Sequence, residues 1–252
     1  CETLSAQLSW QRVTLNRGLF PTDGASTVLS FSSTIPGSDL SYYRLNVRQR
    51  YYQPLTQNLV FGFQGELGYL NAYGDTEETP FFQNFYAGGP RSLRGFESNT
   101  LGPRSTDAPC YEFNYAEGTC PNLLDIDGDG ELDTPYYNPY ANQTSRYRDA
   151  PIGGNIKIEG SLQLIFKLPF IEDQRSLRSA FFFDFGNVFS DNCKEYQINC
   201  SEPSIDDLRY SYGVGITWIT GFGPMSLAIA KPTNAGPRER TEEFQFTVGN
   251  VF

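Results

Sequence analysis

The chain has 252 residues, a formal net charge of −10 and an aromatic content of 15%. Its length fits one β-barrel or β-sandwich, or two small domains. The negative charge argues against a nucleic acid as partner, and no apolar run reaches the roughly 18 residues that a transmembrane helix needs. Transmembrane strands hide their apolar face in alternation, so the composition leaves a membrane barrel open.

Apolar and polar residues alternate with period two along most of the chain, which predicts β-strands. In the segment 59–71, for example, Phe61, Phe63 and Leu67 share one face, and Gln64 lies on the other. We expect about nine strands by this criterion. They lie at residues 5–14, 26–34, 42–53, 59–71, 158–169, 178–189, 208–219, 225–232 and 242–252.

A soluble sandwich would show the same alternation, because one face of each sheet is buried. Three details favour an antiparallel transmembrane barrel: segments of about ten residues, polar faces rich in Gly, and aromatic residues near segment ends. Short turns alternate with long connections at 72–157 and 190–207, as periplasmic turns alternate with extracellular loops. An odd number of strands and a first residue, Cys1, that is not Met favour a piece of a larger barrel.

The connection 72–157 carries the most informative motif of the chain. It contains Gly88-Gly89-Pro90-Arg91-Ser92-Leu93-Arg94-Gly95-Phe96. Long loops without periodic structure are uncommon in compact domains and are usually functional. We expect this loop to carry function.

The cysteines lie in two polar connections. Cys110 and Cys120 are close in sequence, as are Cys193 and Cys200, and Cys1 is left over. Two close pairs in hydrophilic loops predict two local disulfides and an oxidising compartment.

An acidic segment resembles the first half of an EF-hand loop, with oxygen ligands at alternate positions and Gly at the sixth. Its acidic residues are Asp125, Asp127, Asp129, Glu131 and Asp133. Tyr136 stands where the bidentate Glu would be. Two interpretations stay open, a weak Ca²⁺ site in an external loop and an unliganded acidic loop. We expect no other cofactor.

Several motifs, in the same order along the chain, resemble the BamA family, the central subunits of the machinery that assembles bacterial outer-membrane barrels. Arg94-Gly95-Phe96 alone marks a wider superfamily that includes two-partner secretion translocators. The resemblance rests on the segments 17–24, 35–39, 85–96, 99–103 and 244–252.

The resemblance implies that residues 1–252 form the C-terminal portion of the barrel, roughly the last nine strands of sixteen, in the outer membrane of a Gram-negative bacterium. Family members fold and insert other outer-membrane proteins by opening a lateral seam between the first and last strands. Unpaired backbone groups at a sheet edge then template the incoming strand. The implied partners are the lipid bilayer, unfolded outer-membrane proteins, and accessory lipoproteins that bind mostly through POTRA domains absent from this chain.

Two other functions remain open. A passive outer-membrane channel would also alternate in sequence and could fold a loop into its lumen, although it does not require the Arg-Gly-Phe head. A two-partner secretion translocator of the same superfamily is the other. We do not expect an enzyme, because the chain has no His and no nucleophile or phosphate-loop motif.

The resemblance also implies a lock between the loop and the barrel wall, in which Arg94 pairs with Asp184 on the lumen side of a Phe-rich strand. Gln163 stands where the family carries a second carboxylate, and Glu159 on the same face is a candidate substitute. The pair either only positions the loop or also takes part in insertion. We expect Gly95 to permit a sharp chain reversal and Phe96 to anchor the loop inside the lumen.

The final strand carries alternating apolar residues that resemble the assembly signal of the family and would line the seam; a purely lipid-facing strand has the same pattern. These residues are Phe244, Phe246, Val248 and Phe252. A second stripe, Arg44, Arg48 and Arg50 opposite Glu66, is either a selectivity stripe of a pore or a partner of lumen acids and of the inserted loop. Since two sheet edges cannot lie open in lipid, we expect the chain alone to close imperfectly, to pair with a second copy, or to need its missing part.

Overall fold

The computed structural model describes most of the chain. The described residues are 2–35, 37–76, 78–104, 150–168, 171, 176–193, 200–221, 223–236 and 239–249. Among them, no helix is both long and apolar enough to span a membrane.

Nine strands form one antiparallel sheet in the order β1-β2-β3-β4-β6-β7-β8-β9-β11. Each overlaps one of the strands predicted from alternation, so the all-β antiparallel prediction is confirmed. Their bounds are β1 Ser5–Val13, β2 Gly24–Thr34, β3 Tyr42–Pro54, β4 Leu59–Ala72, β6 Ile156–Phe166, β7 Leu177–Phe189, β8 Arg209–Thr220, β9 Gly223–Pro232 and β11 Phe244–Val248.

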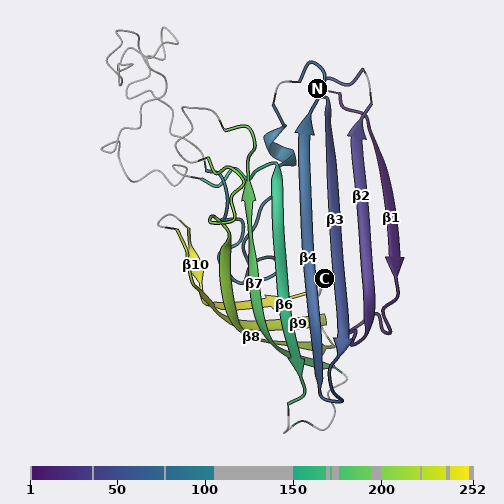
Figure 1. The fold of residues 1–252 in the computed structure, drawn as a ribbon, viewed down its shortest axis with the longest axis vertical. Coiled ribbons are helices and arrows are strands. Elements are labelled where there is room, and N and C mark those ends of the chain that lie inside the picture. Colours follow the sequence, from purple (N-terminus) through teal and green to yellow (C-terminus); the bar gives the residue numbers. More distant parts are fainter. Residues whose placement is uncertain are drawn as a thin grey trace, which may run out of the picture.

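The sheet is a curved wall rather than a flat layer. Strands β1–β4 run near the long axis of the molecule, and β8 and β9 turn across it (Figure 1). Strands β1 and β11 end the sheet order and do not pair with each other within the described part of the chain. How the isolated chain covers these two edges stays a prediction.

The outer face of the wall is apolar across strand after strand. Phe181 on β7 opposes Leu164 on β6 and Val214 on β8 in the antiparallel register. Its side chain is 56% exposed, and those of Trp218 and Phe244 are 53% and 58% exposed. A continuous exposed apolar face of this size marks contact with a partner or a membrane, in agreement with the lipid-facing surface expected of a transmembrane barrel.

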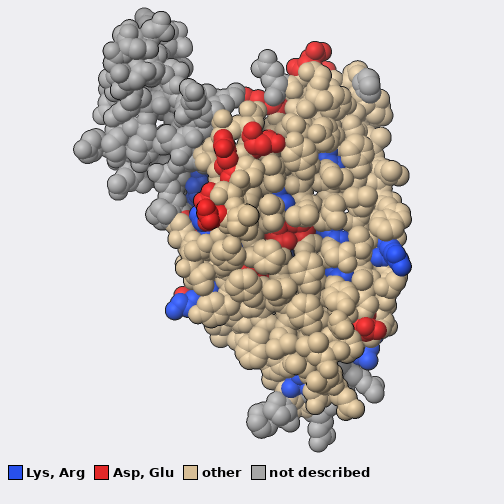
Figure 2. Space-filling view, in the orientation of Figure 1, with Lys and Arg blue, Asp and Glu red and all other residues tan. Residues whose placement is uncertain are grey.

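The described part of the connection between β4 and β6 lies against the inner face. It contains a short 3-10 helix, η1 (Phe81–Gln83), and a two-residue strand, β5 (Gly95–Phe96), which pairs with β10 (Thr241–Glu242). Acidic side chains gather toward the upper end of the wall in Figure 2, where the connections lie.

The start of the final strand differs from the prediction. The sequence predicts one strand at 242–252, but the chain bends at Glu243, and among the described residues of this segment Phe244–Val248 form the strand that joins the main sheet. The preceding Thr241 and Glu242 pair instead with Phe96 and Gly95 of the loop. The backbone of Thr241 and Glu242 therefore pairs with the loop instead of extending β11.

One disulfide lies within the described residues. Cys193 and Cys200 are bonded, with their Cα atoms 5.7 Å apart, which confirms that prediction. The pairing predicted for Cys110 and Cys120 lies outside the described residues.

Candidate functional site: the loop lock

The loop head, residues 85–101, packs against the inner face of the curved sheet through a small apolar core. Backbone bridges join Phe85 to Gly154 and Ala87 to Leu101, which brings the two described parts of the loop together. The buried core combines loop residues with Tyr42 of β3, Leu70 of β4 and Val188 of β7. Its loop members are Phe85, Ala87, Leu93, Phe96 and Leu101. Apolar burial thus fixes where the loop head lies before any charged group is considered.

Arg94 and Asp184 form a bidentate ion pair at the centre of this arrangement. The Arg94 Nε and Nη2 atoms donate to the two carboxylate oxygens of Asp184, each at 2.7 Å. The Arg94 backbone N–H donates to the same carboxylate at 3.2 Å. The Asp184 side chain is fully buried. Paired, charge-assisted hydrogen bonds of this geometry fix orientation as well as distance.

The pairing register of strands β6, β7 and β8 determines which residues surround the Arg94–Asp184 pair. Ser161 on β6 and Ser211 on β8 lie directly opposite Asp184 on its two sides. The Ser161 hydroxyl accepts a hydrogen bond from Arg94 Nη2 at 2.9 Å, and the Arg94 guanidinium lies 3.4 Å from the centre of the Phe182 ring. The guanidinium therefore has a carboxylate, a hydroxyl and an aromatic face as partners.

Gly95 lies where another residue would be strained. Its φ is +90°, and an added Cβ would lie 3.2 Å from Ala230 and 3.2 Å from Pro232 of β9. A positive φ disfavours side chains with a Cβ. The next residue, Phe96, has no exposed surface and belongs to the loop core.

Two residues named from the sequence contact the site differently from the expectation. Gln163 donates to Ser161 at 3.3 Å and so reaches Arg94 only through that hydroxyl. Glu159 accepts a hydrogen bond from Ser92 of the loop and pairs with Lys157 at 3.0 Å. Ser161, which the sequence analysis missed, takes the position beside Arg94 expected for a second acid. The sequence could have indicated Ser161, because alternation places it on the same inward face of the strand as Glu159 and Gln163.

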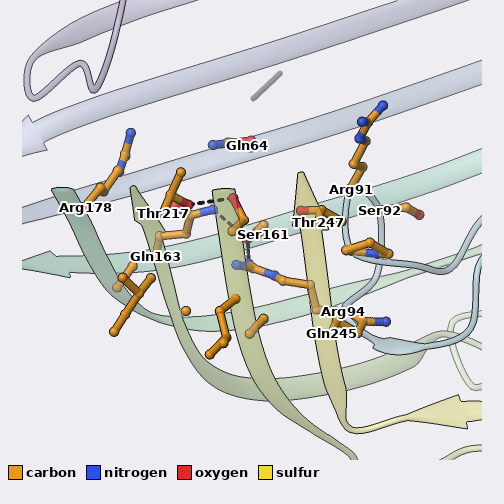
Figure 3. A pocket seen from close by; sticks show the side chains of 17 residues that line it. Gln64, Arg91, Ser92, Arg94, Ser161, Gln163, Arg178, Thr217, Gln245 and Thr247 are labelled. Carbon is orange, nitrogen blue, oxygen red and sulfur yellow. Dashed lines mark hydrogen bonds between the residues drawn. The ribbon is translucent and has the colours of Figure 1, made fainter. Parts of the chain in front are cut away.

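Polar and apolar residues around the loop head line a hollow, seen in Figure 3. Arg94 reaches from the loop toward Ser161, and Gln163 and Gln245 lie on either side (Figure 3). The hollow is also lined by Gln64, Arg91 and Arg178.

The arginine stripe of β3 makes contacts with both the wall and the loop. Arg48 Nη2 lies 3.3 Å from a carboxylate oxygen of Glu66, and Lys157 Nζ lies 3.6 Å from the other oxygen. The guanidinium of Arg44 lies 4.2 Å from the centre of the Phe85 ring of the loop. This arrangement matches partnership with lumen acids and the loop better than a free selectivity stripe.

The final strand places its apolar residues outward. Phe244, Phe246 and Val248 are each more than half exposed, whereas Gln245 between them is 2% exposed. Phe252 lies outside the described residues. So does the acidic segment containing Asp125, Asp127, Asp129, Glu131 and Asp133; within the described ranges no cluster of three or more potential metal ligands occurs.

Comparisons with known proteins agree with this architecture. The outer membrane protein assembly factor BamA of Neisseria meningitidis is 30% identical over 263 residues, which cover 97% of this chain and 28% of that protein. The mouse sorting and assembly machinery component 50 homolog is 25% identical over 184 residues, which cover 71% of this chain and 30% of that protein. Their names describe assembly components, in agreement with the expectation of a non-enzyme.

A solved structure shows the same relationship. BamA from Haemophilus ducreyi lacking POTRA domains 1–3 has a TM-score of 0.72 and 31% identity, covering 97% of this chain and 41% of that chain. This chain therefore spans less than half of each of these relatives, and its resemblance to the BamA family is confirmed. Residues 2–252 match the Omp85 superfamily domain, and the chain belongs to this superfamily.

Proposed function

We propose that this chain is barrel wall and loop lock of an outer-membrane assembly factor, which folds and inserts other outer-membrane proteins in a Gram-negative bacterium. The observation that carries the proposal is the BamA-like match over 97% of the chain. The Arg94–Asp184 lock is consistent with it, because the motif that implied the lock is also the motif of the resemblance.

The last strand is the element on which insertion would act. Within the described residues, five residue pairs join β11 to β9 and ten join β8 to β9. Fewer ladder bonds make β11 easier to displace than the strands behind it. Its free edge would then offer unpaired N–H and C=O groups to a strand of an unfolded client.

The lock supports this mechanism by keeping the rest of the wall fixed. Asp184 holds Arg94 against the β6–β8 wall, and the apolar loop core holds the loop to β3, β4 and β7. Strands β6 to β8 can then keep their places while the seam opens at the other edge of the sheet. Lipid lies against the outer aromatic face, unfolded outer-membrane proteins are the clients, and accessory lipoproteins bind outside this chain through POTRA domains.

A passive channel is less well supported, because the loop core is buried against the inner face of the wall. A secretion translocator keeps the same lock and differs in its client, which crosses the membrane instead of entering it. The assembly factor and the translocator are therefore distinguished by where the client ends up and not by the geometry of the lock.

Client folding in liposomes tests the proposal. The protein in its full natural length is reconstituted, an unfolded small barrel is added, and protease-resistant folded client is followed over time. We expect acceleration by the unmodified protein, a clear loss with Arg94→Ala, and little change with Arg91→Ala, an exposed position of the same loop. Steady ion conductance without acceleration would favour the channel, and transport of a client into the liposome would favour the translocator.

A further inference from the structure

Gln245 joins the last strand to the backbone of the loop head. Its Nε2 atom donates to the Phe96 carbonyl at 2.7 Å, and its Oε1 atom accepts from the Gly95 N–H at 3.3 Å. With 2% exposure, the side chain is buried on the inner face of β11. One side-chain amide thus imitates the paired donor and acceptor that a neighbouring strand would offer.

The residues just before the last strand extend the same attachment. Thr241 and Glu242 pair with Phe96 and Gly95. The Glu97 N–H donates to the Arg240 carbonyl at 3.0 Å, and the Arg240 N–H donates to the Thr100 hydroxyl at 3.2 Å. The loop head is therefore bonded to the last strand and to the segment that leads into it.

This attachment and the lock share adjacent residues. The Arg94 N–H donates to Asp184 of β7, and the next N–H, that of Gly95, donates to Gln245 of β11. Strands β8 and β9 separate β7 from β11 in the sheet. The loop head thus connects β7 to β11 across β8 and β9, through the consecutive backbone N–H groups of Arg94 and Gly95.

Building on the proposed function, we infer that Gln245 is a positioning residue that couples displacement of the last strand to release of the loop head. When β11 leaves β9, the buried amide must leave Gly95 and Phe96. Buried backbone groups without partners are unfavourable, so the loop head is loosened at the same time. By the same coupling, weakening the lock at Arg94 loosens the last strand.

Hydrogen exchange measured by mass spectrometry, on the full-length protein in lipid nanodiscs without client, tests this coupling. Gln245→Met keeps the side-chain length and removes both hydrogen bonds to the loop head, and Thr247→Val is the matched control on the same face of β11. Loss of two neutral hydrogen bonds changes an opening equilibrium about tenfold. We expect exchange to rise about tenfold in peptides covering 93–97 and 244–248, with β3 and β4 unchanged and the control close to the unmodified protein.

Two further variants separate coupling from simple damage. In the Gln245→Met background, a disulfide between Glu97→Cys and Arg240→Cys, whose backbones are joined by a hydrogen bond of 3.0 Å, should restore protection of both peptides until reductant is added. Arg94→Lys should raise exchange in 244–248, and its effect should combine less than additively with that of Gln245→Met.

The inference is overturned if exchange stays unchanged in 244–248, rises equally in β3 and β4, or is not restored by the disulfide. These measurements contain no client. A failure of insertase activity would therefore appear only in the liposome assay, and a failure of the coupling only in exchange.

Discussion

Two groups of ion pairs lie on the inner face of the wall, and they are built differently. In the first, Arg94 holds one carboxylate, Asp184, through two bonds of 2.7 Å, and the side chains are 16% and 0% exposed. In the second, Glu66 is shared between Arg48 and Lys157, and the Arg48 side chain is 58% exposed. Each group joins an arginine to a carboxylate, and the two differ in burial and in geometry.

This difference indicates two roles for charge in one lumen. A fully buried carboxylate needs its cation, and the cation can be supplied only if the loop head is in place. A shared, partly hydrated pair tolerates movement because water and a second partner replace what is lost. We therefore expect the first group to contribute strongly to holding the loop head and the second group to contribute little.

Asp184→Asn should have the largest effect. It keeps the size of the side chain and leaves the Arg94 guanidinium without its anion, which in a buried pair is destabilising by about 3–5 kcal/mol. Urea unfolding of the full-length protein in detergent micelles, followed by tryptophan fluorescence, measures this loss. The corresponding substitution in the second group, Glu66→Gln, is the comparator.

A double variant sharpens this result. Adding Arg94→Met to Asp184→Asn removes the unpaired charge, so the double variant should recover part of the lost stability. If Glu66→Gln is as destabilising as Asp184→Asn, burial does not separate the two groups, and the comparison fails.

Gly95→Ala should have an intermediate effect. The residue needs a φ of +90°, and its Cβ would press on Ala230 and Pro232; holding an ordinary residue in such a conformation is unfavourable by about 1–3 kcal/mol. We expect lower stability in urea, together with protease cleavage in the loop at lower enzyme concentration. Gly18→Ala is the control, since an added Cβ there meets no atom within 4 Å. Equal losses in the two variants would show that the loop head is not specially constrained.

The strands could be predicted from the sequence because alternation is a local signal. Each residue of Leu59–Ala72 reports its own face, whatever the rest of the chain does. The parity of Asp184 and Ser161 was equally readable. Arg94 could be paired with Asp184 only through the family resemblance, because 90 residues separate the two positions.

The contacts of Gln245 could not be predicted from alternation. The pattern places its side chain inward, opposite Phe244 and Phe246, but its partners are backbone groups of the loop, 150 residues away. Backbone groups have no sequence signature. For the same reason, nothing in Thr241 and Glu242 indicated that they would leave the final strand to pair with β5.

Arg48→Gln should have the smallest effect, and it tests the second group directly. Its partner Glu66 keeps Lys157 at 3.6 Å, and an exposed ion pair contributes about 0–1 kcal/mol. We expect a change in unfolding free energy below about 0.5 kcal/mol, which decreases further when salt is raised from about 0.05 to 0.5 M because screening weakens exposed pairs. The Asp184→Asn loss should persist over the same salt range, since water and ions do not reach a fully buried carboxylate. Parallel urea titrations of both variants at the two salt concentrations measure this contrast. If the stability loss of Asp184→Asn vanished at high salt, the Arg94–Asp184 pair would be in contact with solvent, and burial would not distinguish the two groups.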